Sequence, residues 1–306
     1  MLKPKLFAES EHIQIAIYTW GEKPTIDQPR ETLVFAHGFP DRAIFWEKVA
    51  QALKDDFYVV AYDMRGCGES THIRGCQHYK FDSLLKDLFA VIDVVSPDQK
   101  VHLIGHDWGG IYGWNAIRDI EGQKRIVSFT TMAPSLEQVG VYLRTRLLKP
   151  TFKNLWQLIN QLARNSLMTF FSLPLLPELM WRSGLGAWLM KTLITKWEEN
   201  VIYQKNEGLE GDAIRYLGIY RANLLQRVFV AKQSTTDVPV HTLIAEKDPF
   251  LPPRLFADTQ HWASQHTQSF VDASHWAPLS RPNEVAEVIR HFTQSLKPNI
   301  YKGSSE

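Results

Sequence analysis

The sequence predicts an α/β protein in which a mostly parallel sheet has helices on both faces and is interrupted by a helical insertion. Short β-rich runs alternate with helix-length amphipathic segments over residues 1–133, which is typical of βαβ units. From about residue 134 to residue 236 the periodicity is helical and strand-like runs are missing. Two further β-rich runs and a helix follow. We therefore expect one core domain, residues 1–133 and 237–306, with a helical domain inserted at 134–236.

The expected elements follow in order from these patterns. Five β-rich runs precede the insertion: "IQIAIYTW", "TLVFAHG", "YVVAYDMRG", "VHLIGHD" and "IVSFTTMA". Residues 81–95 place apolar side chains on one helical stripe, so this helix should cover one face of the sheet. The stripe consists of Phe81, Leu84, Leu85, Leu88, Phe89 and Ile92. After the insertion, "VPVHTLIAEKD" and "SFVDASHW" are typical of strands, and "NEVAEVIRHFTQSL" of a helix.

The charge of the chain argues against several classes of partner. The formal net charge over 306 residues is +1, so no global field favours nucleic acid or an anionic membrane as the main partner. A small neutral, hydrophobic substrate and water are the expected partners. The insertion holds 13 Lys and Arg against 7 Asp and Glu. We interpret this excess as solvated helix faces, with an anionic substrate or a membrane as the alternative.

The cysteines and the apolar runs favour a soluble, cytoplasmic protein. Cys67 and Cys76 have neither metal-ligand nor redox spacing, so we expect no disulfide framework and no metal site. The N-terminus lacks a signal-peptide pattern, and no apolar run approaches the roughly 18 residues that span a bilayer. The polar tail "KPNIYKGSSE" is compatible with a linker to a further domain. A homodimer also stays open.

Asp107 lies at the centre of a Gly-x-Asp-x-Gly frame between a strand and a helix. Gly105 and Gly109 are small enough to flank the strained turn of a nucleophile elbow, although an aspartate at this position is also a favoured helix cap. Asp248 and His275 each follow a later strand, which gives the order nucleophile, acid, histidine. All three residues should meet at the carboxyl ends of parallel strands.

A second loop at the same edge predicts an oxyanion hole. His37 and Gly38 directly follow the "TLVFA" strand, where a backbone N–H can contribute half of such a hole. The candidate donors are the N–H groups of Phe39 and Trp108.

These motifs resemble those of the α/β-hydrolase fold superfamily, and within it the epoxide hydrolases, followed by the haloalkane dehalogenases. The resemblance covers nearly the whole chain and rests on "HGFPD", "YDMRGCGES", "GHDWGG", Asp248 and His275. It implies a cofactor-free hydrolase in which residues 134–236 form a cap domain over the active site. The complete set of catalytic residues argues against a pure binding module.

A carboxylate nucleophile indicates attack on an sp³ carbon. A serine would leave a stable ether, whereas Asp107 leaves an ester that water can hydrolyse. His275, oriented by Asp248, should activate that water, and its reference pKa of ~6.5 predicts loss of turnover in mild acid. The expected reaction is the opening of an epoxide to a vicinal diol. Displacement of a halide, or opening of a β-lactone, by the same three residues is the alternative.

Stabilisation of the leaving group decides between epoxide and halide. The segment "LGIYRANLL" resembles the epoxide hydrolase segment with a proton-donating tyrosine, here Tyr220. Epoxide hydrolases usually have a second such tyrosine, but Met168 and Phe170 occupy the segment where it is expected. Either Tyr220 acts alone or another tyrosine, such as Tyr142, takes the role. For a halide, the Trp108 indole N–H is the candidate donor, although many dehalogenases have asparagine where this chain has Phe39.

Large apolar side chains of the insertion predict an apolar pocket or tunnel. The residues expected to line it are Leu147, Trp156, Phe171, Leu175 and Trp188. The length of the substrate and its stereochemistry do not follow from these residues.

Overall fold

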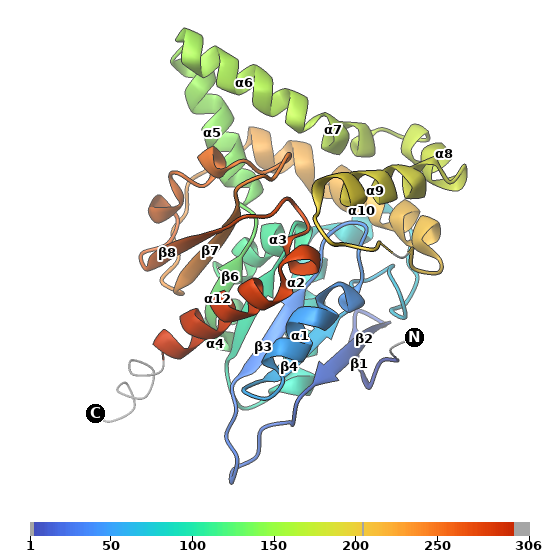
Figure 1. Cartoon of the computed structure of the whole chain (residues 1–306), viewed down its shortest axis with the longest axis vertical. Helices are drawn as coiled ribbons and strands as arrows, with labels where there is room; N and C mark the ends of the chain where they lie inside the picture. The colour runs from blue at the N-terminus through green and yellow to red at the C-terminus, as the bar shows by residue number, and fades with distance from the viewer. Residues whose placement is uncertain (1–2, 204, 297–306) are drawn as a thin grey trace.

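The computed structural model describes residues 3–203 and 205–296, and it is built on one eight-stranded sheet (Figure 1). The strands are β1 (Leu6–Ser10), β2 (Ile13–Trp20), β3 (Thr32–Ala36), β4 (Tyr58–Tyr62), β5 (Val101–Gly105), β6 (Ile126–Thr131), β7 (Val240–Ala245) and β8 (His266–Val271). Their order in the sheet is β1-β2-β4-β3-β5-β6-β7-β8. β2 is antiparallel to its two neighbours, and the other pairs are parallel. The predicted α/β fold class is confirmed.

The sequence patterns did not predict β1. β1 and β2 form a hairpin whose connecting residues, Glu11 and His12, have φ angles of 47° and 69°. Such left-handed turns are usually marked by glycine or asparagine, and neither is present here. The expected hairpin signal is therefore missing from the sequence.

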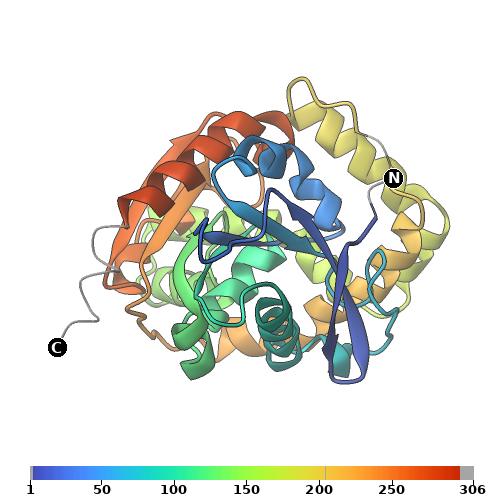
Figure 2. The ribbon, with the colours of Figure 1, turned by 90° about the horizontal axis from the view of Figure 1, so that it is seen from below.

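Helices cover both faces of the sheet. α1 (Glu47–Leu53) and α12 (Pro282–Ser295) pack together on one face, while α2 (Phe81–Val95), α3 (Trp108–Ala116) and α4 (Ile120–Arg125) lie on the other (Figure 2). α2 has the predicted bounds and buries the predicted stripe, with Phe89 only partly buried. The remaining short helices are η1 (Ala43–Trp46), η2 (Cys76–Tyr79), η3 (Pro253–Leu255), η4 (Thr259–His261) and α11 (Ala277–Ser280).

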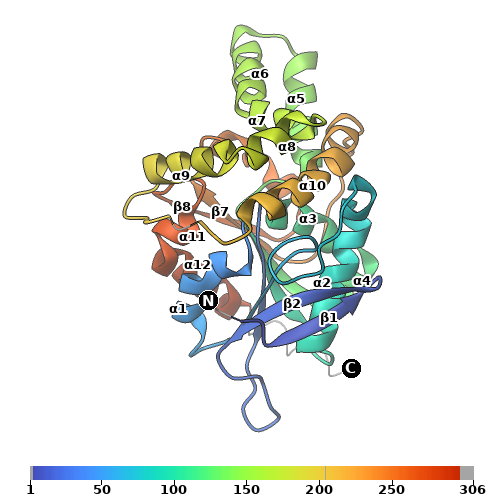
Figure 3. The ribbon, with the colours of Figure 1, turned by 90° about the vertical axis from the view of Figure 1, so that its right-hand side faces the viewer.

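Between β6 and β7, the described residues form helices and no strand. Residue 204 is not among them. The helices are α5 (Leu136–Leu148), α6 (Phe152–Arg164), α7 (Ser166–Ser172), α8 (Leu176–Arg182), α9 (Leu185–Trp197) and α10 (Leu209–Phe229). All lie at one end of the sheet, and α5 and α6 project away from the rest of the molecule (Figures 1 and 3). Because β7 pairs with β6, the segments before and after these helices share one sheet.

The loop after β4 is tied to α2 by a buried ion pair. The guanidinium of Arg65 donates to both carboxylate oxygens of Asp87, at 2.6 and 2.7 Å, and both side chains are almost fully buried. Arg65 also bonds Glu11 in the β1–β2 turn at 3.2 Å. One buried cation therefore connects the hairpin, this loop and α2.

Three other expectations concern the described residues. Cys67 and Cys76 are both free cysteines. Within residues 3–203 and 205–296, no helix is long and apolar enough to cross a membrane, and no group of three or more His, Cys, Asp or Glu is placed to hold a metal ion. The tail 297–306, which we considered as a linker, lies outside the described residues.

Candidate active site

Asp107 occupies a strained turn between β5 and α3. Its φ of 50° and ψ of −122° are unusual for a residue with a side chain, and the side chain makes no capping hydrogen bond to α3. A Cβ added to Gly109 would lie 2.2 Å from the carbonyl oxygen of Ala36, and one added to Gly105 would lie 2.6 Å from that of Gly109. The flanking glycines are therefore required by the close packing of this turn, which favours the elbow interpretation over the helix cap.

Backbone N–H groups converge on the Asp107 carboxylate. The Phe39 N–H donates to Asp107 Oδ1 at 2.8 Å, and the Trp108 N–H, next in the chain, lowers the pKa of the same carboxyl. A Cβ on Gly38 would lie 2.4 Å from that of Asp107, so only glycine allows this approach. Burial raises the pKa of Asp107, and the charge of His275 and the N–H groups of Phe39 and Trp108 oppose the rise. The two predicted oxyanion donors thus meet at one carboxylate.

His37 fixes the loop that contains Phe39. Its Nε2 accepts the Met64 N–H at 2.9 Å, which leaves Nδ1 to donate to the carbonyl oxygen of Gly38 at 2.8 Å. Burial lowers the pKa of His37 to about 4, so the ring is neutral at neutral pH. His37 therefore joins the loop after β3 to the loop after β4 through two hydrogen bonds.

Asp248 and His275 come from the loops after β7 and β8. His275 Nδ1 lies 2.8 Å from Asp248 Oδ2, and His275 Nε2 lies 3.8 Å from Asp107 Oδ2. The other oxygen of Asp248 accepts the N–H groups of Phe250 and Leu251 at 2.7 and 2.9 Å. These bonds hold Asp248 against one ring nitrogen of His275 while the other faces Asp107. The structure therefore brings the three predicted side chains together.

The expectation of an ordinary histidine pKa is wrong. Burial lowers the pKa of His275, but nearby carboxylates outweigh burial and raise it to about 9. These carboxylates are Asp248, Asp107 and Asp41. At neutral pH the resting imidazole is therefore protonated, which sequence reasoning could not find because it requires the distances between charges.

Asp41 is a neighbour of the site that sequence reasoning did not single out. Asp41 is the last residue of the "HGFPD" motif, and its side chain is buried, with 8% of the residue exposed. Its Oδ2 has no hydrogen-bond partner among the described residues. Burial and the negative charge of Asp107 raise the pKa of Asp41 to about 7, although His275 opposes this rise. The motif contained the residue, but only the fold shows that this carboxyl interacts with Asp107 and His275.

A small pocket of about 50 Å³ adjoins these groups. It is lined by Phe39, Asp107, Ile111, Leu167, Met168, Phe171, Met190, Tyr220, Phe250, Leu251, His275 and Trp276. The lining is apolar apart from the carboxylate, the imidazole and one phenol. Such a pocket suits an apolar ligand that presents one reactive polar group.

Tyr220 is the tyrosine that lines this pocket. Burial and the charge of Asp107 raise the pKa of Tyr220 well above 10, so its hydroxyl stays protonated. Its ring packs edge-on against Trp108, with centroids 4.8 Å apart. Tyr142 does not line the pocket, because its ring lies on α5 against the Arg146 guanidinium, 3.6 Å from it. Met168 lines the pocket where a second tyrosine was expected.

The predicted apolar lining was mostly wrong. Phe171 lines the pocket, but the other four residues expected there are exposed at the surface. They are Leu147, Trp156, Leu175 and Trp188. The physical reason is clearest in α6, whose polar side faces residues 249–254 and whose apolar side faces outward. Helical periodicity identifies an apolar stripe but not the side on which the protein lies.

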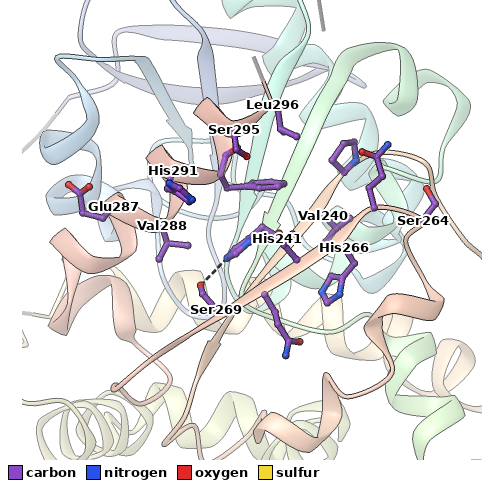
Figure 4. Close-up of a pocket in the computed structure, with 15 residues that line it drawn as sticks. Val240, His241, Ser264, His266, Ser269, Glu287, Val288, His291, Ser295 and Leu296 are labelled. Atoms are coloured by element: carbon purple, nitrogen blue, oxygen red, sulfur yellow. Dashed lines mark hydrogen bonds between the residues drawn. The ribbon is translucent and has the colours of Figure 1, made fainter. Parts of the chain in front are cut away.

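A second hollow lies between β7, β8 and α12, away from Asp107 (Figure 4). Its lining includes His241, His266 and His291. His241 is satisfied by the hydroxyls of Thr267 and Ser269, at 2.8 and 2.9 Å. None of the residues identified by the motifs reaches this hollow, so the candidate chemistry lies in the smaller pocket.

The chain belongs to the α/β-hydrolase fold family. Residues 31–282 match the family described as alpha/beta hydrolase fold. An epoxide hydrolase from Bacillus megaterium, solved with its product, superposes with a TM-score of 0.74 at 20% identity, covering 94% of this chain and all of that one. This likeness concerns the fold.

Curated relatives extend the comparison to sequence. "Probable oxidoreductase EphD" of Mycobacterium tuberculosis is 29% identical over 295 residues, which cover 94% of this chain and 49% of that protein. "Epoxide hydrolase 3" of Xenopus tropicalis is 27% identical over 284 residues, which cover 87% and 72%. The chain spans about half the length of EphD, the first of these relatives. The predicted resemblance to epoxide hydrolases is confirmed.

Proposed function

We propose that this chain is a hydrolase that opens an epoxide to a vicinal diol through an ester on Asp107. The observation that carries the proposal is an aspartate, rather than a serine, at the elbow, with His275 Nε2 3.8 Å from its carboxylate. An ester formed on a carboxylate can be hydrolysed, whereas an ether formed on a serine cannot. The similarity to epoxide hydrolases supports the same substrate class.

In the first half of the reaction, Asp107 Oδ2 attacks a ring carbon and the carbon–oxygen bond of the epoxide breaks. Tyr220 donates a hydrogen bond to the departing oxygen, which becomes an alkoxide and takes up a proton. Formation of the ester removes the negative charge of Asp107, one of the charges that raise the pKa of His275. The imidazolium therefore loses its proton as the alkoxide gains one, and the protons balance.

In the second half, neutral His275 takes a proton from water while the water oxygen bonds to the ester carbonyl carbon. The Phe39 N–H, which binds the carboxylate at rest, and the neighbouring Trp108 N–H would hold the oxyanion. Such donors typically contribute about 3–4 kcal/mol each. Collapse breaks the bond between the acyl carbon and the diol oxygen, and His275 returns the proton to that oxygen. The hydrogen that remains on the new Asp107 carboxyl then passes to His275, which restores the carboxylate and the imidazolium.

The helical insertion acts as a cap domain in this proposal. Residues 134–236 would form the cap, and residues 1–133 and 237–306 the core. The pocket lining supports this division, because Phe171, Met190 and Tyr220 of the insertion face Asp107 and His275 of the core. Met168 and Met190, which line the pocket, have flexible side chains that suit a pocket which adjusts to its substrate.

Replacing His275 with glutamine tests the mechanism. This variant should form the ester but not hydrolyse it, so intact-mass analysis after incubation with an epoxide that the parent hydrolyses should show an adduct on Asp107. Asp107→Ala should form no adduct and lose activity by several orders of magnitude. An unmodified His275→Gln protein would refute the two-step scheme.

Halide displacement is the second candidate. The indole N–H of Trp108 is buried beside the nucleophile and finds no acceptor in hydrogen-bonding geometry among the described residues. It is therefore a free donor for a leaving anion. A panel of styrene-oxide-type epoxides assayed beside a panel of haloalkanes separates the two reactions. Halide release without diol formation would favour a dehalogenase.

A further inference from the structure

Helix α6 exposes its apolar side to solvent. Its outward residues follow the spacing of one helical stripe, and we call them the α6 face: Phe152, Leu155, Trp156, Ile159 and Leu162. Phe152 is 89% exposed, Trp156 61% and Ile159 60%. Such aromatic and aliphatic side chains rarely gather on the free surface of a monomer. The α6 face therefore requires a physical explanation.

The polar side of α6 holds the helix in this orientation. Arg164 donates to the carbonyl oxygen of Pro249 at 2.6 Å, and Gln161 to that of Phe250 at 3.2 Å. Asn160 accepts from Arg254 at 2.8 Å. These bonds join α6 to the loop that contains Asp248. Rotating the α6 face inward would break all of them, so the outward apolar side is fixed by contacts with the core domain.

Positive charge predominates in the segment that contains the α6 face. Residues 144–197 contain eight Lys and Arg and a single acidic residue, Glu178. That glutamate is already paired with Arg221 of α10, at 2.7 Å. Lys149 and Lys153 are exposed beside the apolar stripe. An apolar helix face containing tryptophan and phenylalanine and flanked by lysine is typical of helices that lie in the interface of a membrane.

We propose that the α6 face docks on an anionic phospholipid bilayer. The apolar side chains would enter the boundary between headgroups and acyl chains, and the flanking lysines would pair with anionic headgroups. The charge favours a bilayer over a second copy of the chain, because two copies meeting at this face would bring two strongly positive segments together. The projection of α5 and α6 from the molecule makes the face accessible to a flat surface (Figure 3).

Other apolar side chains of the insertion are also exposed. Leu175, Leu176 and Leu179, in and before α8, are exposed, as is Trp188 of α9. α9 also contributes Met190 to the pocket lining. Docking would therefore bring the helices that line the pocket close to the bilayer, where apolar compounds concentrate. The docking itself is independent of the reaction catalysed.

Vesicle sedimentation with the whole chain tests the proposal. The parent should bind vesicles of phosphatidylcholine mixed with phosphatidylglycerol, more weakly in high salt, and should bind pure phosphatidylcholine less. Phe152→Ser/Trp156→Ser should lower the partition coefficient at least about tenfold, because two aromatic side chains no longer enter the bilayer. Lys149→Gln/Lys153→Gln should weaken binding to the anionic vesicles alone.

A matched pair of exposed isoleucines outside the insertion provides the control. Ile26→Ser/Ile120→Ser removes apolar side chains that are 100% and 73% exposed and should leave the partition coefficient unchanged. Turnover of a water-soluble epoxide should be unchanged in every variant, which separates failure of docking from failure of the proposed reaction. Equal binding by the parent and Phe152→Ser/Trp156→Ser would overturn the proposal. A parent dimer that this substitution converts to a monomer would also overturn it, and would assign the face to self-association.

Discussion

Tyr220 gives the proposed reaction its most specific residue-level prediction. With Met168 in the place of a second tyrosine, Tyr220→Phe removes the phenol that lines the pocket. A hydrogen bond to a charged group contributes about 1.5–3 kcal/mol, so ring opening should slow by roughly tenfold to a hundredfold. Halide displacement should be nearly unchanged, because a halide leaves without a proton. Single-turnover rates with both substrates measure the difference, and full epoxide activity in the variant would make Tyr220 a packing residue.

Asp41 should set the pH range of ester hydrolysis. Its negative charge helps to raise the pKa of His275, so His275 keeps its proton up to a higher pH than it otherwise would. Asp41→Asn should lower that pKa and make the neutral imidazole available in more acidic solution. The acid limb of the ester-hydrolysis rate should therefore move to lower pH, while the exposed control Asp98→Asn leaves it in place. An acid limb that stays in place or moves to higher pH would show that the charge of Asp41 does not raise the pKa of His275.

The residues of the candidate site could be predicted where a sequence motif contained them. Asp107, Asp248 and His275 follow strands in an informative chain order, and the structure brings them together. The pKa of His275 and the role of Asp41 could not be predicted, because both depend on distances between charges that the fold alone creates.

At the scale of elements, local patterns predicted helices and strands better than their orientation. α2 was predicted with its bounds because a polar face and an apolar face alternate clearly over 15 residues. The stripe of α6 was equally visible, but its outward direction depends on hydrogen bonds to residues 249–254. β1 was missed because its turn contains Glu11 and His12 rather than glycine or asparagine.

We expect the buried ion pair between Arg65 and Asp87 to be the polar interaction that contributes most to holding α2 in place. Asp87→Ala leaves the Arg65 cation buried without its bidentate partner, which should lower the free energy of unfolding by about 3–5 kcal/mol. Asp93→Ala on the same helix breaks an exposed ion pair with Arg125 and should cost no more than about 1 kcal/mol. Urea denaturation of the two variants measures the difference. An equal decrease in the free energy of unfolding for the two variants would show that burial does not decide how much these ion pairs contribute to stability.

At the scale of the whole molecule, one mostly parallel sheet explains how distant segments form one site. β6 and β7 pair across the helical insertion, so the loops after β5, β7 and β8 meet at one edge of the sheet. This convergence could be predicted, because carboxyl ends of parallel strands always share an edge. The packing of the helical insertion on that edge could not be predicted, because the apolar stripes of its helices are compatible with more than one orientation of those helices.

The origin of the oxygen atom in the first diol product tests the central claim most directly. A single turnover is run in water labelled with heavy oxygen, with enzyme in excess over an epoxide. If Asp107 attacks carbon, the first diol takes its new oxygen from the carboxylate, so it is unlabelled and the Asp107 peptide gains the label. If water attacks the epoxide directly, the first diol is labelled and the Asp107 peptide keeps its ordinary mass, which would contradict the account.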